Sequence, residues 1–172
     1  MSQLGHPGLK ISFDEQDYLC DVGRTRLRPQ RVEGVRRATV SDLPQVASLR
    51  AAFECEYFGV AYARIDQTWC LRAAERYVAQ GAWVAQRDGC IVSMVAVEAD
   101  IPGITHIGAV YTLPAYRGRG LAKGVTSATC EEQLAAKERV TLTVRIDNLP
   151  ALSAYAALGF QRREDYRMCR LA

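Results

Sequence analysis

From residue 110 to residue 122 the chain reads Val110-Tyr111-Thr112-Leu113-Pro114-Ala115-Tyr116-Arg117-Gly118-Arg119-Gly120-Leu121-Ala122. An apolar run ends at Pro114, a turn rich in glycine and arginine follows, and a helical pattern opens at about Leu121. The two glycines allow the backbone to approach a ligand without Cβ clashes. The first backbone N–H groups of a helix have no partner inside it and can bind an anion, and the two arginines suit phosphate. This stretch therefore predicts a phosphate-binding turn.

A glycine turn after a strand has other readings. It also occurs as an ordinary surface turn and within dinucleotide-binding folds. The full G-x-G-x-x-G fingerprint is absent here, because Lys123 stands where the third glycine belongs. The rest of the chain has to decide between these possibilities.

Length and composition limit the function classes. A chain of 172 residues, 49% apolar and 24% charged, predicts one soluble globular domain. The net charge of +3 is too small to argue for nucleic acid. The longest apolar runs have the length of strands, so no membrane span is expected, and the polar N-terminus does not resemble a signal peptide. We expect a cytoplasmic protein with free thiols.

Six cysteines and two histidines are scattered through the sequence. No C-x-x-C pair occurs, and no cysteine lies near a histidine at the spacing of metal ligands. The sequence therefore predicts no metal site.

Hydrophobic periodicity and turn residues predict an α/β (or α+β) single domain with a mixed sheet flanked by helices. The expected order is strand 35–39, helices 42–58 and 66–80, strands 82–86, 90–99 and 104–112, helix 121–137, strand 140–146, helix 151–158 and strand 160–171. The strands on either side of helix 121–137 should pair in parallel through a right-handed crossover.

Residues 1–34 are expected to form an N-terminal extension ahead of a domain that spans residues 35–172. Short strands at Ile11–Phe13 and Tyr18–Cys20 could flank the acidic run Asp14–Asp17 as an extra hairpin. A solvated loop and a dedicated binding arm are the other interpretations.

Two sequence motifs, and the distance between them along the chain, resemble those of a known family. Arg117, Gly120 and Ala122 match the pattern Arg/Gln-x-x-Gly-x-Gly/Ala. Near the C-terminus a second signature comprises Asn148, Ala151, Tyr155 and Leu158-Gly159-Phe160. Both patterns and the element order resemble the GNAT superfamily of N-acetyltransferases, over about residues 35 to 171. The resemblance implies a sheet whose two central parallel strands splay apart.

The resemblance also implies a binding site for acetyl-CoA as co-substrate. The pyrophosphate would lie on backbone N–H groups at the helix start, and the pantetheine amides would bind the splayed strand. A backbone N–H in that strand would polarise the acetyl carbonyl. The implied cofactor-binding residues are Val110, Tyr111, Thr112, Arg117, Gly118, Arg119, Gly120, Leu121, Ala122 and Asn148.

Candidate catalytic residues are less well defined. Tyr155 matches the family's usual general acid, and a phenol is protonated at neutral pH; it could also be a packing tyrosine. Some family members have a glutamate base on the strand before the loop, but that strand here offers only His106, which could instead be a solvent-facing residue. The rivals for the base are Glu98, Glu54, Glu56 and ordered water.

The resulting prediction is an N-acetyltransferase that moves acetyl from acetyl-CoA to a primary amine, on a small molecule or a protein, by direct attack in a ternary complex. The alternatives are a non-catalytic acyl-CoA-binding sensor and a protein that binds another phosphate compound. No nucleic-acid or membrane partner is expected. An exposed edge at the last strand is compatible with a homodimer.

Overall fold

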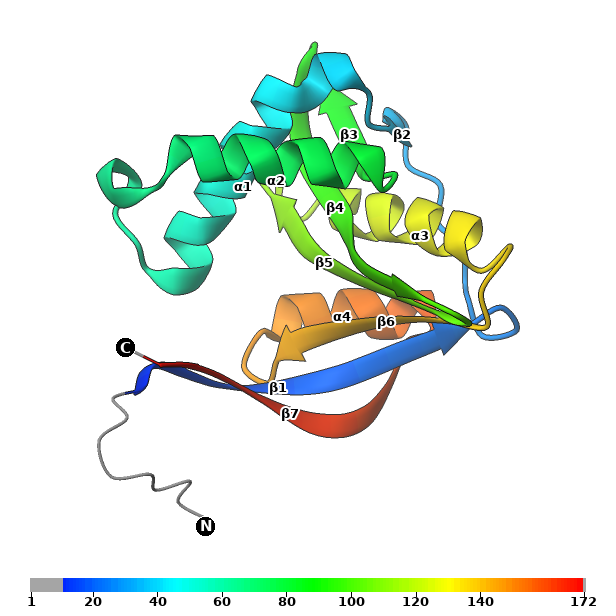
Figure 1. Ribbon diagram of the computed structural model, residues 1–172. Coiled ribbons are helices and arrows are strands. Elements are labelled where there is room, and N and C mark those ends of the chain that lie inside the picture. The colour runs from blue at the N-terminus through cyan, green and yellow to red at the C-terminus, as the bar shows by residue number, and fades with distance from the viewer. Residues whose placement is uncertain (1–10, 172) are drawn as a thin grey trace.

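A computed structural model describes residues 11–171 of the chain (Figure 1). Within this range seven strands form one mixed sheet in the order β2-β3-β4-β5-β6-β1-β7, and four α-helices cover it. The strands are β1 (Ile11–Gly23), β2 (Val35–Arg37), β3 (Trp83–Arg87), β4 (Cys90–Ile101), β5 (Ile104–Thr112), β6 (Arg139–Arg145) and β7 (Gln161–Leu171). The α-helices are α1 (Leu43–Phe58), α2 (Gln67–Ala79), α3 (Leu121–Gln133) and α4 (Leu149–Leu158). Short 3₁₀ turns span Val40–Asp42, Tyr62–Arg64 and Pro114–Tyr116. The predicted mixed α/β fold is confirmed.

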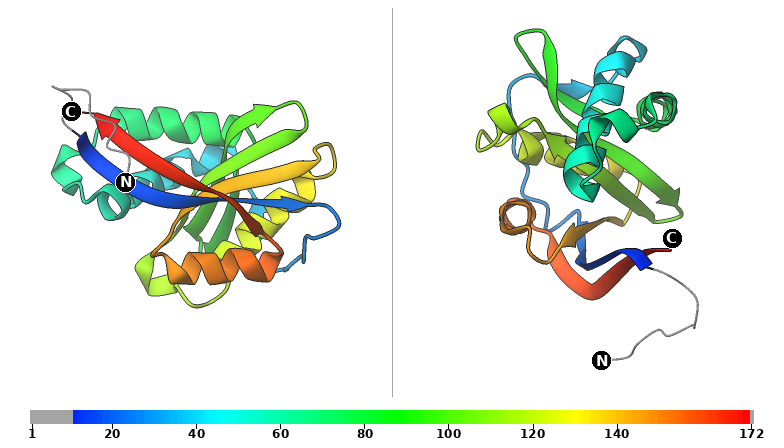
Figure 2. Two further views of the ribbon diagram at one scale, coloured as in Figure 1. Left: turned by 90° about the horizontal axis from the view of Figure 1, so that it is seen from below. Right: turned by 90° about the vertical axis from the view of Figure 1, so that its left-hand side faces the viewer.

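The sheet separates two hydrophobic cores. Helices α1 and α2 pack on one face around buried residues such as Tyr77 and Met94. Helices α3 and α4 pack on the other face around residues such as Leu121 and Leu142. Figure 2 shows these two helical layers on opposite sides of the strands.

Strands β5 and β6 are the parallel pair, joined by α3 as the sequence predicts. Their pairing is short: Ile104 opposes Arg139, Thr105 opposes Val140 and His106 opposes Thr141, and within residues 11–171 no further β5–β6 partners follow. Beyond these pairs the strands diverge, which leaves a V-shaped gap that opens toward the end of α1 (Figure 1).

The N-terminal segment differs from the prediction. Ile11–Gly23 is a single strand, β1, that lies between β6 and β7 and pairs antiparallel with both. The expected extra hairpin ahead of the domain is therefore wrong. The acidic run suggests a turn by its sequence alone, but arginines from the neighbouring strands pair with two of its carboxylates: Asp14 with Arg167 of β7, and Glu15 with Arg145 of β6.

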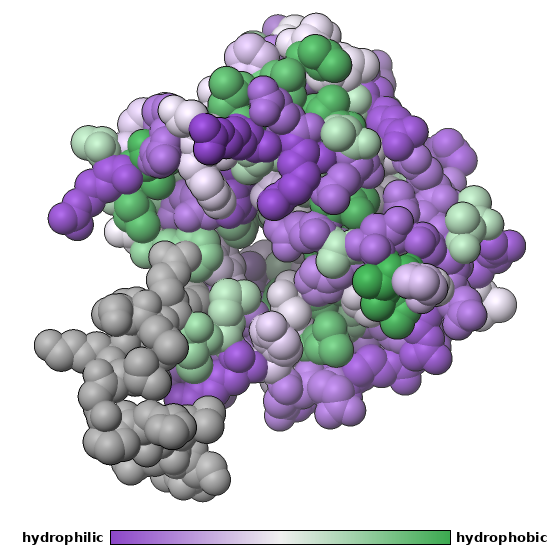
Figure 3. All heavy atoms as spheres, viewed as in Figure 1, coloured by the Kyte–Doolittle hydropathy of each residue, from purple (hydrophilic) through white to green (hydrophobic). Residues whose placement is uncertain are grey.

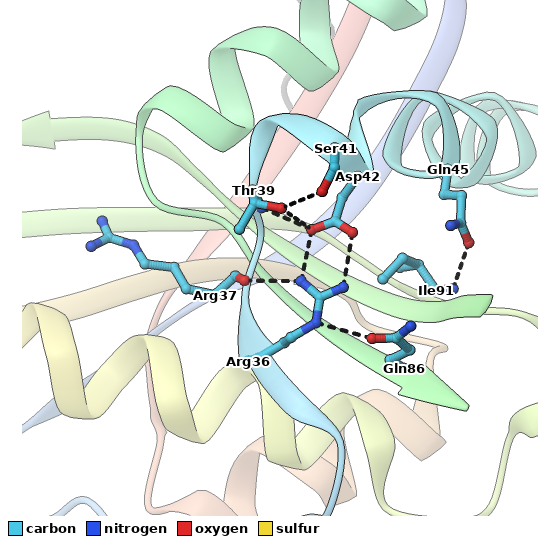
Figure 4. Close-up of polar contacts among 8 residues, drawn as sticks. All are labelled: Arg36, Arg37, Thr39, Ser41, Asp42, Gln45, Gln86 and Ile91. Carbon is cyan, nitrogen blue, oxygen red and sulfur yellow. Dashed lines mark hydrogen bonds and ion pairs between the residues drawn. The ribbon is translucent and has the colours of Figure 1, made fainter. Parts of the chain in front are cut away.

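An ion pair fixes the start of α1 (Figure 4). The Arg36 guanidinium donates two hydrogen bonds to the Asp42 carboxylate, at 2.7 and 2.8 Å, and its Nε donates to Gln86 at 3.1 Å. Asp42 also accepts from the backbone N–H of Thr39 at 2.8 Å. The bond with Arg36 holds the pKa of the Asp42 carboxyl well below its usual range. This contact ties α1 to β2 and β3.

Strand β7 lies at one edge of the sheet and β2 at the other. The expected exposed edge at the last strand is therefore present. Whether two copies of the chain pair along it stays a prediction.

Candidate cofactor site

A β-bulge on β5 redirects the side chains beside the gap. Gly108 opposes Ala96 and Tyr111 opposes Met94, so β5 carries one residue more than β4 between these pairs. Ala109 takes a positive φ of 47°, which is uncommon for a residue with a Cβ. The usual alternation is therefore interrupted at the end of the strand, next to the motif.

The bulge turns Val110 and Thr112 toward a cleft on the α3–α4 side. Before it, Ile107 packs in the α3–α4 core; after it, Ala109 and Tyr111 pack in the α1–α2 core. The side chain of Tyr111, a predicted cofactor residue, is therefore buried under α1 and does not line the cleft. A ligand in the cleft therefore does not meet the Tyr111 side chain.

The loop after β5 leads directly into α3. Gly118 and Gly120 have φ values of 73° and 76°, which strain residues that carry a Cβ. Space beside both glycines is open, since no heavy atom lies within 4 Å of a Cβ built on either. The backbone N–H of Gly124 donates to the Gly120 carbonyl, so the helical hydrogen bonds of α3 begin at Gly120. The N–H groups of the first turn of α3 therefore point toward this loop.

The predicted positive charge at this loop is largely engaged. The Nε of Arg117 donates to the Thr112 carbonyl at 3.0 Å, and its guanidinium pairs with Glu56 of α1 at 2.6 Å. Glu56 also accepts from the Tyr111 hydroxyl at 3.1 Å. The hydrogen bond from Arg117 lowers the pKa of the Glu56 carboxyl, which keeps this carboxylate ionised at the mouth of the cleft.

Arg119 lies apart from the cleft. It stacks over the Tyr116 ring at 5.2 Å and donates to the Ala115 carbonyl at 3.3 Å. Lys123, in the first turn of α3, lines the cleft instead, together with Glu56. The sequence could have suggested Lys123 as a residue of the cleft, because it lies one helical turn after Gly120.

Helix α4 supplies the opposite wall. Asn148 caps the helix by accepting from the backbone N–H of Ala151 at 3.2 Å, and it borders the cleft. Tyr155 is 8% exposed, packs 5.7 Å from Phe160 between ring centroids, and also lines the cleft. Burial raises the pKa of the Tyr155 hydroxyl, so the phenol keeps its proton at neutral pH.

The two motifs thus meet in one cleft of about 520 Å³. Its predicted cofactor residues are Val110, Thr112, Arg117, Gly118, Gly120, Leu121, Ala122 and Asn148, to which Tyr155 is added. Much of the α4 wall consists of small residues: Ala151, Ser153, Ala154 and Ala157. The small side chains leave room for an extended ligand, and the N–H groups at the start of α3 can bind an anionic group on it.

His106 lies elsewhere. Its Nδ1 is 3.0 Å from the Thr141 hydroxyl at the last β5–β6 pair, and it does not line the cleft. Burial lowers the pKa of His106, and the nearby Glu98 carboxylate opposes this effect. Glu98 occupies the space over Gly108, where its carboxylate oxygen is 2.2 Å from a Cβ built on the glycine. Both candidates for the base therefore lie near the start of the gap.

Between residues 11 and 171 no three His, Cys, Asp or Glu side chains are grouped to hold a metal ion. No helix in this range is long and apolar enough to span a bilayer. All six cysteines are free, and three of them (Cys20, Cys70 and Cys130) are buried.

Comparison with known proteins gives the family. The model of the acetyltransferase (GNAT) family matches residues 44–160, which is more than half of the chain. The chain therefore belongs to the GNAT acetyltransferase family, as the motifs predict. No curated protein sequence matches it significantly.

Solved structures share the fold at low sequence identity. A GNAT-family acetyltransferase from Novosphingobium aromaticivorans DSM 12444 is 22% identical, with a TM-score of 0.74 over 95% of this chain and 66% of that one. An acetyltransferase from the GNAT family of Colwellia psychrerythraea is 13% identical, with a TM-score of 0.71 over 96% and 58%. The chain spans less than two thirds of the length of both.

A shorter structure matches over most of its own length. It is a predicted acetyltransferase from Clostridium acetobutylicum, solved with acetyl-CoA, at 22% identity and a TM-score of 0.58. The match covers 76% of this chain and 90% of that one.

Proposed function

We propose that the protein is an N-acetyltransferase that moves an acetyl group from acetyl-CoA to a primary amine within a ternary complex. The observation that supports this most is the cleft, which joins the glycine loop after β5 to Tyr155 on α4. Family membership supports acyl transfer, and the relative solved with acetyl-CoA supports the donor.

In this proposal the CoA pyrophosphate lies on the backbone N–H groups of residues 118–122, at the positive end of α3. The pantetheine arm runs along Val110–Thr112, where β5 has no partner on the β6 side. Lys123 adds a cation beside the phosphates. Arg117 contributes by holding the loop to the Thr112 carbonyl rather than as a free charge.

The chemistry needs no covalent enzyme intermediate. The amine nitrogen attacks the thioester carbonyl carbon, a new N–C bond forms, and the C–S bond breaks. A backbone N–H at the bulge would stabilise the negative oxygen of the tetrahedral intermediate. Tyr155 would donate its proton to the departing thiolate, and its raised pKa means that the phenol still carries this proton at neutral pH.

The proton lost by the amine needs an acceptor. His106 is our candidate, because its lowered pKa keeps the ring neutral at pH 7 and it lies where β5 and β6 begin to diverge. Its distance from the cleft favours transfer through water rather than direct contact.

CoA release from acetyl-CoA, measured over a panel of amines, tests this proposal. We expect release that depends on an amine and is accompanied by the acetylated product. Wild-type protein that binds CoA but releases none with any amine would contradict it.

A non-catalytic acyl-CoA sensor is the second candidate. One observation favours it: among the described residues that line the cleft there is no histidine, and the one carboxylate, Glu56, is paired with Arg117. Binding of CoA without turnover, unaffected by Tyr155→Phe, would favour the sensor.

A further inference from the structure

Asp17 on β1 is a buried carboxylate without a partner. Its side chain is 1% exposed, and within the described part of the chain neither carboxylate oxygen has a hydrogen-bond partner. Asp21, four residues further on the same face of the strand, is also buried but forms ion pairs with Arg26, Arg139 and Arg163. Of the two buried carboxylates on this face of β1, Asp21 is therefore compensated by arginines and Asp17 is not.

The surroundings of Asp17 contain more negative than positive charge. Arg145, opposite Asp17 on β6, pairs with Glu15 at 2.5 Å and with Asp147 at 2.8 Å. Three carboxylates thus share one guanidinium. Tyr57, at the end of α1, is the neutral group that faces them, and Arg145 lies 5.9 Å from its ring centroid.

Burial, and next the charge of Glu15, raise the pKa of Asp17 to about 6. Arg145 opposes this effect and Asp147 adds to it. A buried carboxylate costs free energy unless a cation or a donor compensates it. A cationic group that can donate hydrogen bonds would therefore compensate the charge of Asp17.

Its place in the fold connects it to the proposed reaction. The Asp17–Arg145 pair lies at the carboxyl end of β6, beyond the last β5–β6 pair at His106 and Thr141, where the V-shaped gap is open. Glu56, which lines the cofactor cleft, immediately precedes Tyr57 in α1. The last turn of α1 therefore touches both the cleft and the carboxylates, and Figure 3 shows a hollow on this face of the molecule.

We propose that Asp17 binds the second ammonium group of a dicationic amine whose other amino group is acetylated. This inference rests on the proposed function. An ammonium supplies a positive charge and three donors, which match the unpaired oxygens of Asp17. The distal ammonium undergoes no bond change, and the near amino group attacks the thioester. Since Asp17 is covered, the side chains above it, Tyr57 among them, must turn aside to admit the ligand.

The test compares linear diamines of three to six carbons with monoamines of the same length. We expect wild-type protein to favour a diamine in kcat/KM, and Asp17→Asn to reduce this preference about tenfold, the worth of one modest ion pair. The kcat/KM for the monoamine should not change.

Asp14→Asn is the matched control. Asp14 lies on the same strand, pairs with Arg167 and is exposed, so this variant removes the same charge on the other face of the sheet. The diamine preference should survive in this variant. If both variants lose it equally, general electrostatic attraction explains the preference and the assignment of Asp17 is wrong.

Diamine-induced thermal stabilisation, measured without acetyl-CoA, separates the two proposals. Stabilisation that requires Asp17, without acetylation of any amine, would support the subsite and contradict the transferase. Equal acetylation of monoamines and diamines by wild type and Asp17→Asn would contradict the subsite and leave the transferase standing. Neither stabilisation nor turnover would overturn both.

Discussion

The two sides of the gap between β5 and β6 are built from different chemical groups. On the cofactor side, backbone N–H groups, glycines and the small residues of α4 form much of the wall, with Lys123 and the Arg117–Glu56 ion pair beside them. On the other side, the end of α1 faces charged side chains from β1 and β6, with Asp17 and Arg145 at the same level. The first surface suits a ligand common to a family, since backbone groups bind phosphate whatever the neighbouring side chains are. The charged side chains of β1 and β6 can vary without disturbing the cofactor surface. On their side of the gap this chain would select its amine substrate.

The largest effect is expected on the cofactor side, from Gly120→Glu. The change places a carboxylate where we expect the pyrophosphate and strains a residue with φ of 76°. CoA affinity, measured by calorimetry, should fall about 1,000-fold, or about 4 kcal/mol.

Gly89→Glu is its control. Gly89 has φ of 80° and equally open space around a Cβ, but lies in the turn between β3 and β4. It should carry the same backbone strain and leave CoA affinity unchanged. Equal loss of affinity in the two variants would mean that strain, rather than the ligand site, is responsible.

Tyr155→Phe tests the chemistry on the same side. The phenylalanine keeps the ring beside Phe160 and removes only the hydroxyl. Because general acid catalysis contributes 100-fold or more, kcat should fall about 100-fold while CoA affinity stays the same. A kcat within a factor of about two of wild type would remove Tyr155 from the mechanism.

Asp17→Asn tests whether the charge of the Asp17 carboxylate, on the β1 side of the gap, destabilises the folded protein. A carboxyl whose pKa rises from 3.8 to about 6 on folding binds its proton more tightly in the folded state. Its charge therefore costs stability above pH 6, the cost declines as pH falls through 6, and it is absent below pH 4. The shift corresponds to at most about 3 kcal/mol, and we expect Asp17→Asn to stabilise the protein by about 2 kcal/mol at pH 8.

Denaturant unfolding at pH 8 and pH 4 measures this effect, and the stabilisation should vanish at the lower pH. Destabilisation by Asp17→Asn at pH 8 would instead indicate that the carboxylate has a partner that compensates it.

Glu56→Gln gives the smallest effect and acts where the two sides meet. It breaks the half-exposed ion pair with Arg117, so the protein should lose no more than about 1 kcal/mol of stability. Loss of a negative charge at the cleft and release of the Arg117 guanidinium should tighten CoA binding about threefold at low salt. Weaker CoA binding, measured by the same calorimetry, would show that Glu56 is needed to position Arg117.

What the sequence could predict follows the same division. The loop after β5 and the start of α3 are encoded by neighbouring residues, and both lie where the sequence predicts them. The parallel β5–β6 pair follows from the strand–helix–strand order, because a helical crossover brings its two strands side by side in parallel.

Features that depend on distant residues were missed. Strand β1 carries an acidic run that is typical of a turn, and arginines from β6 and β7 pair with Glu15 and Asp14 of that run across the sheet. The positive φ at the bulge falls on Ala109 rather than on the adjacent Gly108, so the sequence does not mark the bulge's effect on Tyr111. Arg117 was expected to face phosphate, but its partner Glu56 lies 61 residues away in α1.

A crystal structure with CoA bound tests the central claim most directly. The account predicts pyrophosphate oxygens within hydrogen-bond distance of the backbone N–H groups of residues 118–122. It also predicts the CoA sulfur about 3 to 4 Å from the Tyr155 hydroxyl, at the gap between β5 and β6. A pyrophosphate bound away from this loop, or a sulfur far from both Tyr155 and the gap, would contradict it.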